Sequence, residues 1–396
     1  MLAPMGRTLP LCVCVVLALS ACDAVAAQEH VTLRATHPDG VPLHPSEGSR
    51  RMSGRLPDGL VVSVVRWGAG RRWLEVRTPD GTQGWVVARY LARRAPPDPL
   101  AAVGAVWRSE ASCLRSPRPP RPNENPRLAS WNLRWFPDGS SHGQSQHPTR
   151  VRWVACAIAA LNVDLVAVQE VMLHARGRAA IAELTGHLSE RTGGRWESRF
   201  DACPRDGRQH VGVLFDASRV QLSNERALAE VNPLGGCTGH LRPGFAAAAQ
   251  FVGGRRLTVV TVHLDSGREA RDHGHRVESV ERLAQLAGGF GDAVILGDFN
   301  TMGTDAIEAS QELARLDERF ARADMRRLSA SVPCTEFYRR RGGLLDLAVA
   351  SEGVRATAQV EGLCAELSCR LPRGGEPEAI ASLSDHCPLV VDVAPN

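Results

Sequence analysis

Apolar runs of strand length alternate with helical patterns over residues 126–396, and this alternation constrains the fold more than any other feature of the sequence. The runs 257–264 and 293–296 read as buried strands. Between them, Val277, Val280 and Ala284 recur at the spacing of one helical face. Helices that alternate with buried strands pack in layers, because each helix covers one face of a sheet. The sequence therefore predicts a layered α/β domain over these residues.

The chain of 396 residues is longer than one typical domain, and a proline- and arginine-rich stretch divides it. This stretch, residues 95–125, predicts an extended linker. Residues 30–94 read as short strands between glycine-containing turns, which indicates a small all-β barrel. The ending from Trp73 to Tyr90 resembles a bacterial SH3-like domain. That resemblance implies a module that binds peptidoglycan or peptide, and a spacer without a ligand is the alternative.

The first residues have the order of a secretory signal. Arg7 precedes the apolar run 9–19, which is too short to span a bilayer, and small residues follow. The tetrapeptide Leu-Ser-Ala-Cys that ends at Cys22 resembles the lipobox of bacterial lipoproteins. The resemblance implies that residues 1–22 hold the signal peptide and lipidation site. We then expect an exported protein, lipid-anchored at Cys22 in the bacterial cell envelope and facing the periplasm or the cell surface. An ordinary signal peptide cut near residue 26 is the alternative.

Eight cysteines follow the proposed lipidation site. They are Cys113, Cys156, Cys203, Cys237, Cys334, Cys364, Cys369 and Cys387. An even number of cysteines outside the cytoplasm predicts disulfides. Their connectivity cannot be deduced from the sequence, and Cys203–Cys237 and Cys364–Cys369 are the pairings we expect first. No CxxC pair occurs after Cys22, which argues against a cysteine zinc site.

The basic residues of the chain are all arginine, so chemistry that needs a lysine is excluded. From Arg127 onward, 31 arginines face 33 acidic residues, a net charge of −2, so the overall +4 comes from residues 1–126, where 16 arginines face 10 acidic residues. The larger domain therefore has no global positive charge of the kind that marks many proteins binding nucleic acid.

Polar residues stand at the ends of the apolar strands of the larger domain, and their order is the strongest signal in the sequence. The motifs are Ser130-Trp131-Asn132-Leu133, Val168-Gln169-Glu170, Val262-His263-Leu264, Gly297-Asp298-Phe299-Asn300, Leu345-Asp346 and Ser384-Asp385-His386. This series resembles the endonuclease/exonuclease/phosphatase superfamily, which includes deoxyribonucleases, abasic-site endonucleases, sphingomyelinases and inositol-polyphosphate phosphatases. The resemblance implies a four-layer α/β sandwich, two packed mixed sheets flanked by helices, with the site at one rim.

The residue types in these motifs suit phosphodiester hydrolysis, which needs charge neutralised on the phosphoryl oxygens and a positioned water. Mg²⁺ or Mn²⁺ prefers oxygen ligands. We expect Glu170 to be the main metal ligand, with the amide oxygen of Asn132 beside it. Asp385 is expected to bind a second metal or to assist the site. For Glu170 and Asn132, a helix-capping carboxylate and a turn residue are the structural alternatives.

The remaining motif residues are expected to act on the water and the phosphate. Asp298 would orient or deprotonate the water, and Asn300, two residues later, would hold a phosphate oxygen. A protonated His386 would stabilise the transition state, with Asp346 orienting its ring. His263 is expected to contact the scissile phosphate or the leaving oxygen. A core histidine satisfied by the surrounding structure is the alternative for either imidazole.

Three further segments have weaker signals. Arg208-Gln209-His210 is either a substrate-facing group or a solvated loop. Asp272-His273-Gly274-His275 looks like a metal pair, but we interpret it as a helix N-terminus because an apolar helical pattern starts directly afterwards. Arginines cluster at 339–341 and at Arg268, Arg271 and Arg276, where they could follow a phosphate backbone or could simply be solvated.

The sequence thus favours a monomeric, Mg²⁺- or Mn²⁺-dependent nuclease that cleaves DNA or RNA by in-line attack of water. A lipid phosphodiesterase is the alternative enzyme, although no exposed aromatic hairpin typical of membrane-acting relatives is apparent in the sequence. A non-catalytic envelope-binding lipoprotein is the alternative outside the enzymes. The filled acid, amide and imidazole positions argue against it, because a relic domain would have lost some of them.

Overall fold

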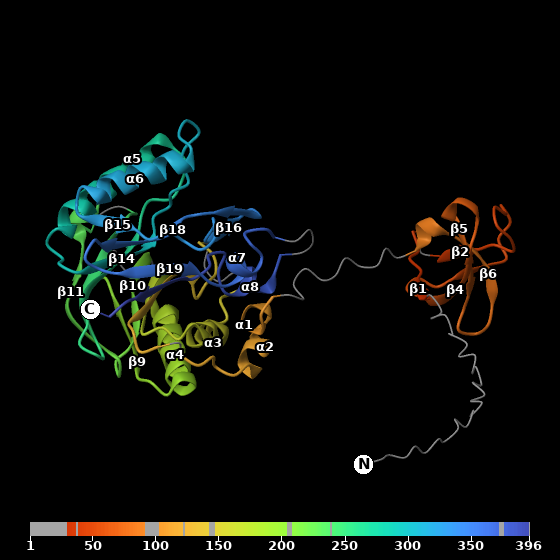
Figure 1. Ribbon diagram of the computed structural model, residues 1–396, viewed down its shortest axis with the longest axis horizontal. Coiled ribbons are helices and arrows are strands. Elements are labelled where there is room, and N and C mark those ends of the chain that lie inside the picture. The colour runs from red at the N-terminus through yellow and green to blue at the C-terminus, as the bar shows by residue number, and fades with distance from the viewer. Residues whose placement is uncertain are drawn as a thin grey trace, which may run out of the picture. The chain divides into compact units, whose positions relative to one another are not determined.

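The computed structural model describes residues 30–36, 39–91, 103–121, 123–141, 147–203, 208–237, 240–371 and 376–395. The chain divides into two compact units, residues 1–97 and 98–396 (Figure 1). The predicted signal segment and Cys22 lie outside the described residues. No helix among the described residues is long and apolar enough to cross a membrane.

The first unit is a small, strand-rich module. Its four-stranded antiparallel sheet has the order β1 (His30–Thr32), β4 (Val61–Trp67), β5 (Trp73–Arg77), β6 (Gln83–Val87). A hairpin of β2 (Val41–Leu43) and β3 (Gly54–Leu56) and the short 3-10 helices η1 (Ala69–Arg71) and η2 (Ala88–Tyr90) complete it. Alternate residues of β5, Leu74 and Val76, point into the core, as expected for a strand with one buried face. Whether the module is SH3-like stays a prediction.

The second unit contains two six-stranded mixed sheets. The first has the order β19 (Ala356–Val360), β20 (Leu389–Val393), β7 (Arg127–Phe136), β8 (Leu165–Met172), β10 (Gln209–Asp216), β9 (Trp196–Phe200). The second has the order β11 (Val220–Ala227), β12 (Arg242–Phe251), β13 (Arg256–His263), β14 (Ala293–Asp298), β18 (Asp346–Ser351), β15 (Met325–Arg327). Each sheet contains one parallel pair, β7 with β8 and β13 with β14.

Both parallel pairs are connected through a helix, because parallel neighbours need a crossover. Helix α3 (Val151–Leu161) joins β7 to β8, and α5 (Ala270–Ala287) joins β13 to β14. The carboxyl ends of two parallel strands lie at the same edge of their sheet, which is where α/β proteins place ligands. The crossovers therefore bring the motif residues that end β7, β8, β13 and β14 to common edges.

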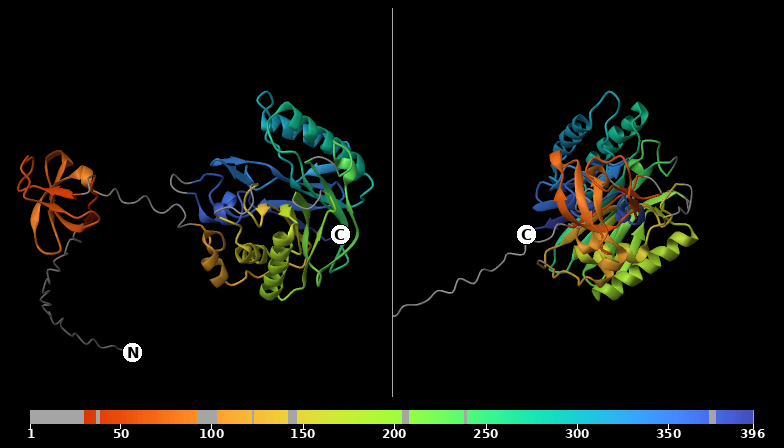
Figure 2. Two further views of the ribbon diagram at one scale, coloured as in Figure 1. Left: turned by 180° about the vertical axis from the view of Figure 1, so that it is seen from behind. Right: turned by 90° about the vertical axis from the view of Figure 1, so that its right-hand side faces the viewer.

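Helices cover the outer faces of the two sheets (Figures 1 and 2). Helices α3 and α4 (Ala175–Thr192) pack on the first sheet, and α5 and α6 (Ala309–Ala321) pack on the second. The buried stripe of α4, formed by Ile181, Leu184 and Leu188, shows why this segment is helical, since its apolar residues recur on one face. The predicted four-layer α/β sandwich is confirmed.

Part of the predicted linker belongs to the second unit instead. Helices α1 (Ala105–Arg108) and α2 (Glu110–Arg115) lie within residues 95–125. Trp107 is buried edge-on against Trp131, with ring centroids 6.0 Å apart, and Cys113 forms a disulfide with Cys156 of α3. The proline-rich composition hid these few apolar anchors. The smaller elements that remain are η3 (Ala229–Val231), the hairpin β16 (Glu336–Tyr338) and β17 (Arg341–Gly343), α7 (Leu363–Glu366) and α8 (Glu378–Ser382).

The eight cysteines that follow Cys22 all form disulfides: Cys113–Cys156, Cys203–Cys237, Cys334–Cys369 and Cys364–Cys387. The predicted pair Cys203–Cys237 is confirmed. The predicted pair Cys364–Cys369 is wrong. Cys364 lies on α7, where its buried side chain meets Cys387, whereas Cys369 lies beyond that helix and meets Cys334.

Candidate active site

The motif residues of both sheets meet at one rim of the sandwich. Asn132 lies on β7 and Glu170 on β8, in the first sheet. His263 and Asp298 end β13 and β14 in the second sheet, where they are direct neighbours in the parallel register. Asp298 is also paired with Asp346, the first residue of β18. The strand ladders thus fix three polar side chains next to one another before any side-chain contact is considered.

The amide of Asn132 joins the two sheets. Its Nδ2 donates to Glu170 Oε1 at 3.1 Å and to Asp298 Oδ2 at 3.0 Å. Its Oδ1 accepts the backbone N–H of Arg134 at 2.9 Å. The side chain is fully buried, so these contacts hold it in one orientation. A carboxylate from each sheet is therefore anchored to one neutral amide.

The backbone around this amide adopts conformations that ordinary side chains avoid. Arg134, Trp135, Glu170 and Asn300 all have positive φ, between 47° and 59°. The turn at Trp135 lets its N–H donate to Glu170 Oε2 at 3.1 Å. Such residues cost free energy, and they persist where the surrounding structure requires them, often at functional sites. Their concentration here indicates a site shaped by more than packing.

Asp298 is held by the turn that follows it. The N–H of Asn300 donates to Asp298 Oδ1 at 2.9 Å, and Asn300 Nδ2 donates to the Leu264 carbonyl oxygen at 3.0 Å. Gly297 is required directly before Asp298, because a Cβ at this position would collide with the carbonyl oxygen of Val262. Burial raises the pKa of Asp298 to about 7; the charge of His386 opposes this rise, and nearby carboxylates add to it.

His386 and Asp346 form a buried pair. His386 Nδ1 donates to Asp346 Oδ2 at 2.7 Å, and Asp346 Oδ1 has no partner among the described residues. The backbone also fixes the pair, because Trp131 Nε1 donates to the His386 carbonyl oxygen at 2.9 Å. Burial alone would lower the pKa of His386, but the Asp346 charge, its hydrogen bond and Asp298 together raise that pKa well above its usual range. The imidazole is thereby kept charged.

His263 lies in the opposite kind of environment. Its Nε2 is 3.5 Å from Asp298 Oδ2 and 3.8 Å from Glu170 Oε1, while its buried Nδ1 has no partner among the described residues. Burial, followed by the charges of Arg242 and His386, holds the pKa of His263 well below its usual range. This imidazole is thereby kept neutral.

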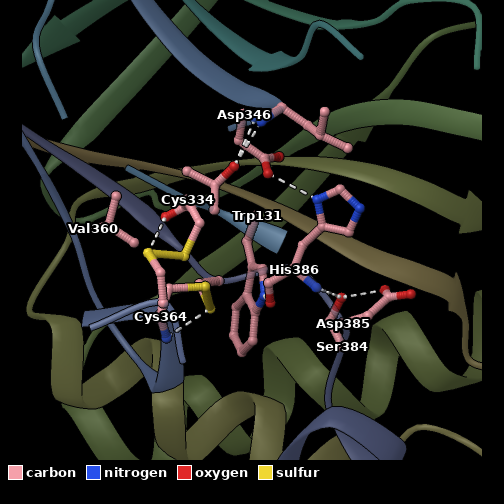
Figure 3. The surroundings of a disulfide bond; sticks show 12 residues. Trp131, Cys334, Asp346, Val360, Cys364, Ser384, Asp385 and His386 are labelled. Atoms are coloured by element: carbon pink, nitrogen blue, oxygen red, sulfur yellow. Dashed lines mark hydrogen bonds and ion pairs between the residues drawn. A yellow bond between two sulfur atoms is a disulfide. The ribbon is translucent and has the colours of Figure 1, made fainter. Parts of the chain in front are cut away.

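Two disulfides lie near the His386 side of the site, with Trp131 between them and His386 in the view of Figure 3. Cys387, the residue after His386, is bonded to Cys364, and Cys334 is bonded to Cys369. Cys334 precedes Thr335, whose hydroxyl oxygen accepts the backbone N–H of Asp346 at 2.9 Å and whose carbonyl oxygen accepts the N–H of Cys387 at 2.7 Å. Both disulfides therefore tie the 363–369 segment to the strands and loops that carry the His386–Asp346 pair.

The donor set suits a hard divalent cation. Glu170, His263 and Asp298 offer ligand atoms within 4.8 Å of one another, as do Asp298, Asp346 and His386. Burial raises the pKa of Glu170, its hydrogen bond from Asn132 opposes the rise, and the charge of Asp385 adds to it. Mutually repelling carboxylates at one rim are what a bound cation would relieve, and carboxylate oxygens are the ligands that Mg²⁺ and Mn²⁺ prefer. Asp385 lies at the edge of the group, 3.6 Å from Arg134 Nε.

No protein-family model matches the chain, and no curated protein matches it. Among solved structures it is similar to an endonuclease/exonuclease/phosphatase from Bacteroides vulgatus, with 18% identity, 69% of this chain and 100% of that chain covered, and a TM-score of 0.49. It is also similar to D. rerio TDP2 complexed with a single-strand DNA product, with 15% identity, 69% of this chain and 100% of that chain covered, and a TM-score of 0.49. The human Nocturnin catalytic domain with bound sulfate is similar at 16% identity, with 69% of this chain and 95% of that chain covered and a TM-score of 0.47.

The structure brings together all the motif residues expected at the site. Asn132, Glu170 and Asp298 share hydrogen bonds, His386 and Asp346 form their pair, and His263, Asn300 and Asp385 lie within or beside the group. The expected amide role of Asn300 is modified, because one of its amide hydrogens is already donated to the Leu264 carbonyl oxygen.

Sequence reasoning missed two residues beside the site. The backbone of Glu336 in β16 pairs with that of His386 in a single antiparallel β-bridge, and burial raises the pKa of the Glu336 carboxyl to about 8. Arg242 is paired in register with His263, and its Nη2 donates to the Leu264 carbonyl oxygen at 3.2 Å. Glu336 had no visible sequence signal, because a short hairpin brings it to the site. Arg242 could have been noticed as the one cation at the start of the apolar strand 245–251.

The weaker sequence signals have mixed outcomes. His210 is neither solvated nor exposed, because it is buried in β10 with Nδ1 2.9 Å from Asp201 Oδ1. The segment from Asp272 to His275 begins α5, as predicted. Arg276 is buried in an ion pair with Glu312 at 2.6 Å, so it is not available to a phosphate backbone.

The hairpin β16–β17 exposes one aromatic side chain beside the site. Tyr338 at its turn is 60% exposed, and the guanidinium of Arg339 lies 5.2 Å from the centre of its ring. Arg340 and Arg341 follow directly. Because β16 begins at Glu336, which bridges to His386, this exposed aromatic and basic turn is anchored beside the site.

Proposed function

We propose that the chain is a metal-dependent phosphodiester hydrolase that cleaves nucleic acid by in-line attack of water. One observation carries the proposal above the others: the Asn132 amide binds a carboxylate from each sheet, Glu170 and Asp298, and the charged His386–Asp346 pair lies on the other side of Asp298. Anionic ligands on one side and a fixed cation on the other suit a phosphoryl group in transfer.

A divalent cation would be held by Glu170, with Asp385 as a further oxygen donor. Asn132, expected as an oxygen ligand, would instead position Glu170, because its Oδ1 accepts the Arg134 N–H and its Nδ2 faces the carboxylates. When bound, Mg²⁺ or Mn²⁺ would neutralise charge on the phosphoryl oxygens. The raised pKa of Glu170, caused by burial and by Asp385, supports a cation at this position. Chelation should abolish hydrolysis of a chromogenic phosphodiester, and added Mg²⁺ or Mn²⁺ should restore it. Full activity in the presence of a chelator would refute the proposal.

The side chains of the chain divide the remaining work. Asp298, fixed by the Asn300 N–H at 2.9 Å, orients the attacking water and accepts its proton. His386 donates a hydrogen bond to a phosphoryl oxygen from Nε2, since Nδ1 is engaged by Asp346. His263 offers a neutral Nε2 near the Asp298 carboxylate, and there it contacts the phosphate or the leaving oxygen.

Nucleic acid is the substrate class that the surface beside the site supports. The β16–β17 turn combines an exposed Tyr338 with three consecutive arginines. Aromatic side chains stack on bases, and arginines contact the phosphate backbone without reading sequence. Purified protein should therefore cleave plasmid DNA or RNA in Mg²⁺ faster than it hydrolyses sphingomyelin or an inositol phosphate. The opposite ranking would establish a lipid or inositol phosphodiesterase.

We further propose that the protein is exported and anchored to the bacterial envelope through a lipid on Cys22. The Leu-Ser-Ala-Cys context supports lipidation, and four disulfides support an oxidising compartment. The first unit would contact peptidoglycan or peptide, and the enzyme would act as a monomer. Cys22→Ala should release the protein from membranes. Unchanged membrane retention, together with no fatty-acid labelling of the wild type, would refute the anchor.

A further inference from the structure

A second group of metal-binding side chains lies outside the site described above. Asp265 follows β13 by two residues, His240 precedes β12, and His275 lies in the second turn of α5. His275 Nδ1 is 2.7 Å from Asp265 Oδ2, and His240 Nε2 is 3.3 Å from Asp265 Oδ1. The three ligand atoms lie within 4.8 Å of one another. Three segments far apart in the sequence thus present two imidazoles and one carboxylate to a common point.

We propose that His240, Asp265 and His275 bind one divalent transition-metal ion of the zinc class, separately from the carboxylates of the hydrolytic site. The chemistry of the ligands selects the ion. Two imidazole nitrogens with one carboxylate suit Zn²⁺, Co²⁺ or Ni²⁺, whereas Mg²⁺ prefers oxygen donors such as those around Glu170. The two groups would therefore take different metals.

The spacing of the ligand atoms fits such an ion. Zinc lies about 2.0–2.2 Å from nitrogen and oxygen ligands, so tetrahedral ligands are separated by roughly 3.4 Å. The separations of 2.7 and 3.3 Å between Asp265 oxygens and the two imidazole nitrogens need only small side-chain adjustments to reach that value. The His240 side chain is 49% exposed, which leaves an open side for ion entry and for water as a fourth ligand.

Two arginines hold the backbone of this cluster in place. Arg276 Nη1 donates to the carbonyl oxygens of Asp265, at 3.3 Å, and Gly267, at 2.8 Å, while Glu312 neutralises its charge. Arg242 donates to the carbonyl oxygens of His240, at 3.4 Å, and Leu264, at 3.2 Å. Outer contacts of this kind orient metal ligands and strengthen binding.

The helix that carries His275 also explains why the sequence concealed this group. His273 and His275 are adjacent in the motif but do not act together. His273 faces Glu312 at 4.0 Å, and His275 reaches Asp265. The metal partners of His275 are 10 and 35 residues away in the chain, at Asp265 and His240.

Cobalt binding tests the proposal without any measurement of hydrolysis. The full chain, stripped of metal with a chelator and kept in excess Mg²⁺, should bind Co²⁺ with visible d–d absorption bands, and Zn²⁺ should displace it. His240→Ala and His275→Ala should each remove one bound Co²⁺ or weaken its binding by more than about tenfold, because loss of a direct ligand exceeds the usual effect of an outer contact. Hydrolysis in Mg²⁺ by His240→Ala should be unchanged.

His187→Ala is the matched control, because His187 also lies between two carboxylates, those of Glu183 and Glu190, but on an exposed helix face. This variant should bind Co²⁺ as the wild type does. The His240 variant guards against misfolding of the His275 variant, since His240 is half-exposed and lies outside any helix or strand. Equal Co²⁺ stoichiometry and affinity in the wild type and in both ligand variants would overturn the proposal, as would no binding in excess Mg²⁺. A failure of the hydrolase proposal would leave these results unaffected.

Discussion

Two histidines lie close to the same carboxylate oxygen of Asp298, and their surroundings differ. His386 Nε2 lies 3.9 Å and His263 Nε2 3.5 Å from Asp298 Oδ2. His386 is hydrogen-bonded to Asp346, and two disulfides hold the segments that carry this pair (Figure 3). His263 has no hydrogen-bond partner for Nδ1 among the described residues, and its backbone is held between β12 and β14.

The difference shows how the surroundings of one side-chain type shift its pKa in opposite directions. The Asp346 carboxylate raises the pKa of His386 despite burial, whereas burial and Arg242 lower the pKa of His263. One imidazole is therefore a fixed cation and the other a neutral donor or acceptor. This combination suits the proposed phosphoryl transfer, because the cation can neutralise charge on the phosphate while Asp298 accepts the proton.

Removing the carboxylate that both histidines share should have the largest effect. Asp298→Ala loses the group that orients the water, so kcat should fall by about 10² or more. Circular dichroism and the melting temperature of the variant should show an intact fold. Near-wild-type hydrolysis of plasmid DNA by this variant would mean that neither histidine acts on a water held by Asp298.

Removing the partner of one histidine should sharpen the comparison. Asp346→Asn keeps the shape but removes the charge that raises the pKa of His386. The imidazolium is present below its pKa and is lost as the pH rises through it, so the variant should lose activity at a lower pH than the wild type does. The rate ratio of wild type to variant should therefore be larger near pH 8 than near pH 6, up to about tenfold or more. A ratio independent of pH would indicate a purely structural role for Asp346.

Reducing the disulfides should affect the His386 side more than the rest of the molecule. Cys387→Ser removes the bond to Cys364, next to His386, and should destabilise the domain by about 2–4 kcal/mol and lower kcat several-fold. Cys203→Ser breaks the disulfide with Cys237, which links two segments that carry neither His386 nor Asp346, and serves as the control. Equal losses of kcat in the two variants at a temperature where both are folded would contradict the bracing role.

The smallest effect is expected on the β16–β17 turn. Arg339→Ala removes one exposed cation and should weaken nucleic-acid binding modestly, with the same effect on every sequence. Hydrolysis of long DNA should slow with added salt in the wild type, and less steeply in the variant. A small chromogenic phosphodiester should be hydrolysed equally by both proteins. If the variant changed this control reaction as well, the turn would be acting through His386 rather than through the substrate.

Much of this arrangement could be predicted from the sequence, since strand-end motifs and helical crossovers place residues by local rules. Asn132 and Glu170 end up on neighbouring parallel strands, as do His263 and Asp298, and the helical spacing between the latter predicts the crossover itself. The same alternation of strands and helices predicts a layered α/β domain, and the four-layer arrangement with two packed sheets is implied by the resemblance of the motif series.

The features that escaped prediction depend on contacts between distant segments. The partners of Cys364 and Cys369 are set by the direction in which α7 points its side chains, which the cysteine spacing does not reveal. Trp107 and Cys113 hold a proline-rich segment against the domain, because the contacts of a few apolar side chains decide its position more than its overall composition does. Glu336 reaches the site only through the short β16–β17 hairpin.

The difference between the two imidazoles is tested most directly by exchanging each of them for glutamine and measuring kcat on plasmid DNA in Mg²⁺. Glutamine keeps a neutral N–H donor but cannot carry a positive charge. His386→Gln should therefore lose a factor of about 10² or more, because it removes the cation that stabilises the transition state. His263→Gln should retain most activity, since a neutral side chain replaces a neutral imidazole. Equal losses of kcat in the two variants, with both proteins folded, would contradict the conclusion that the two histidines carry different charges because Asp346 lies beside His386 and Arg242 lies near His263.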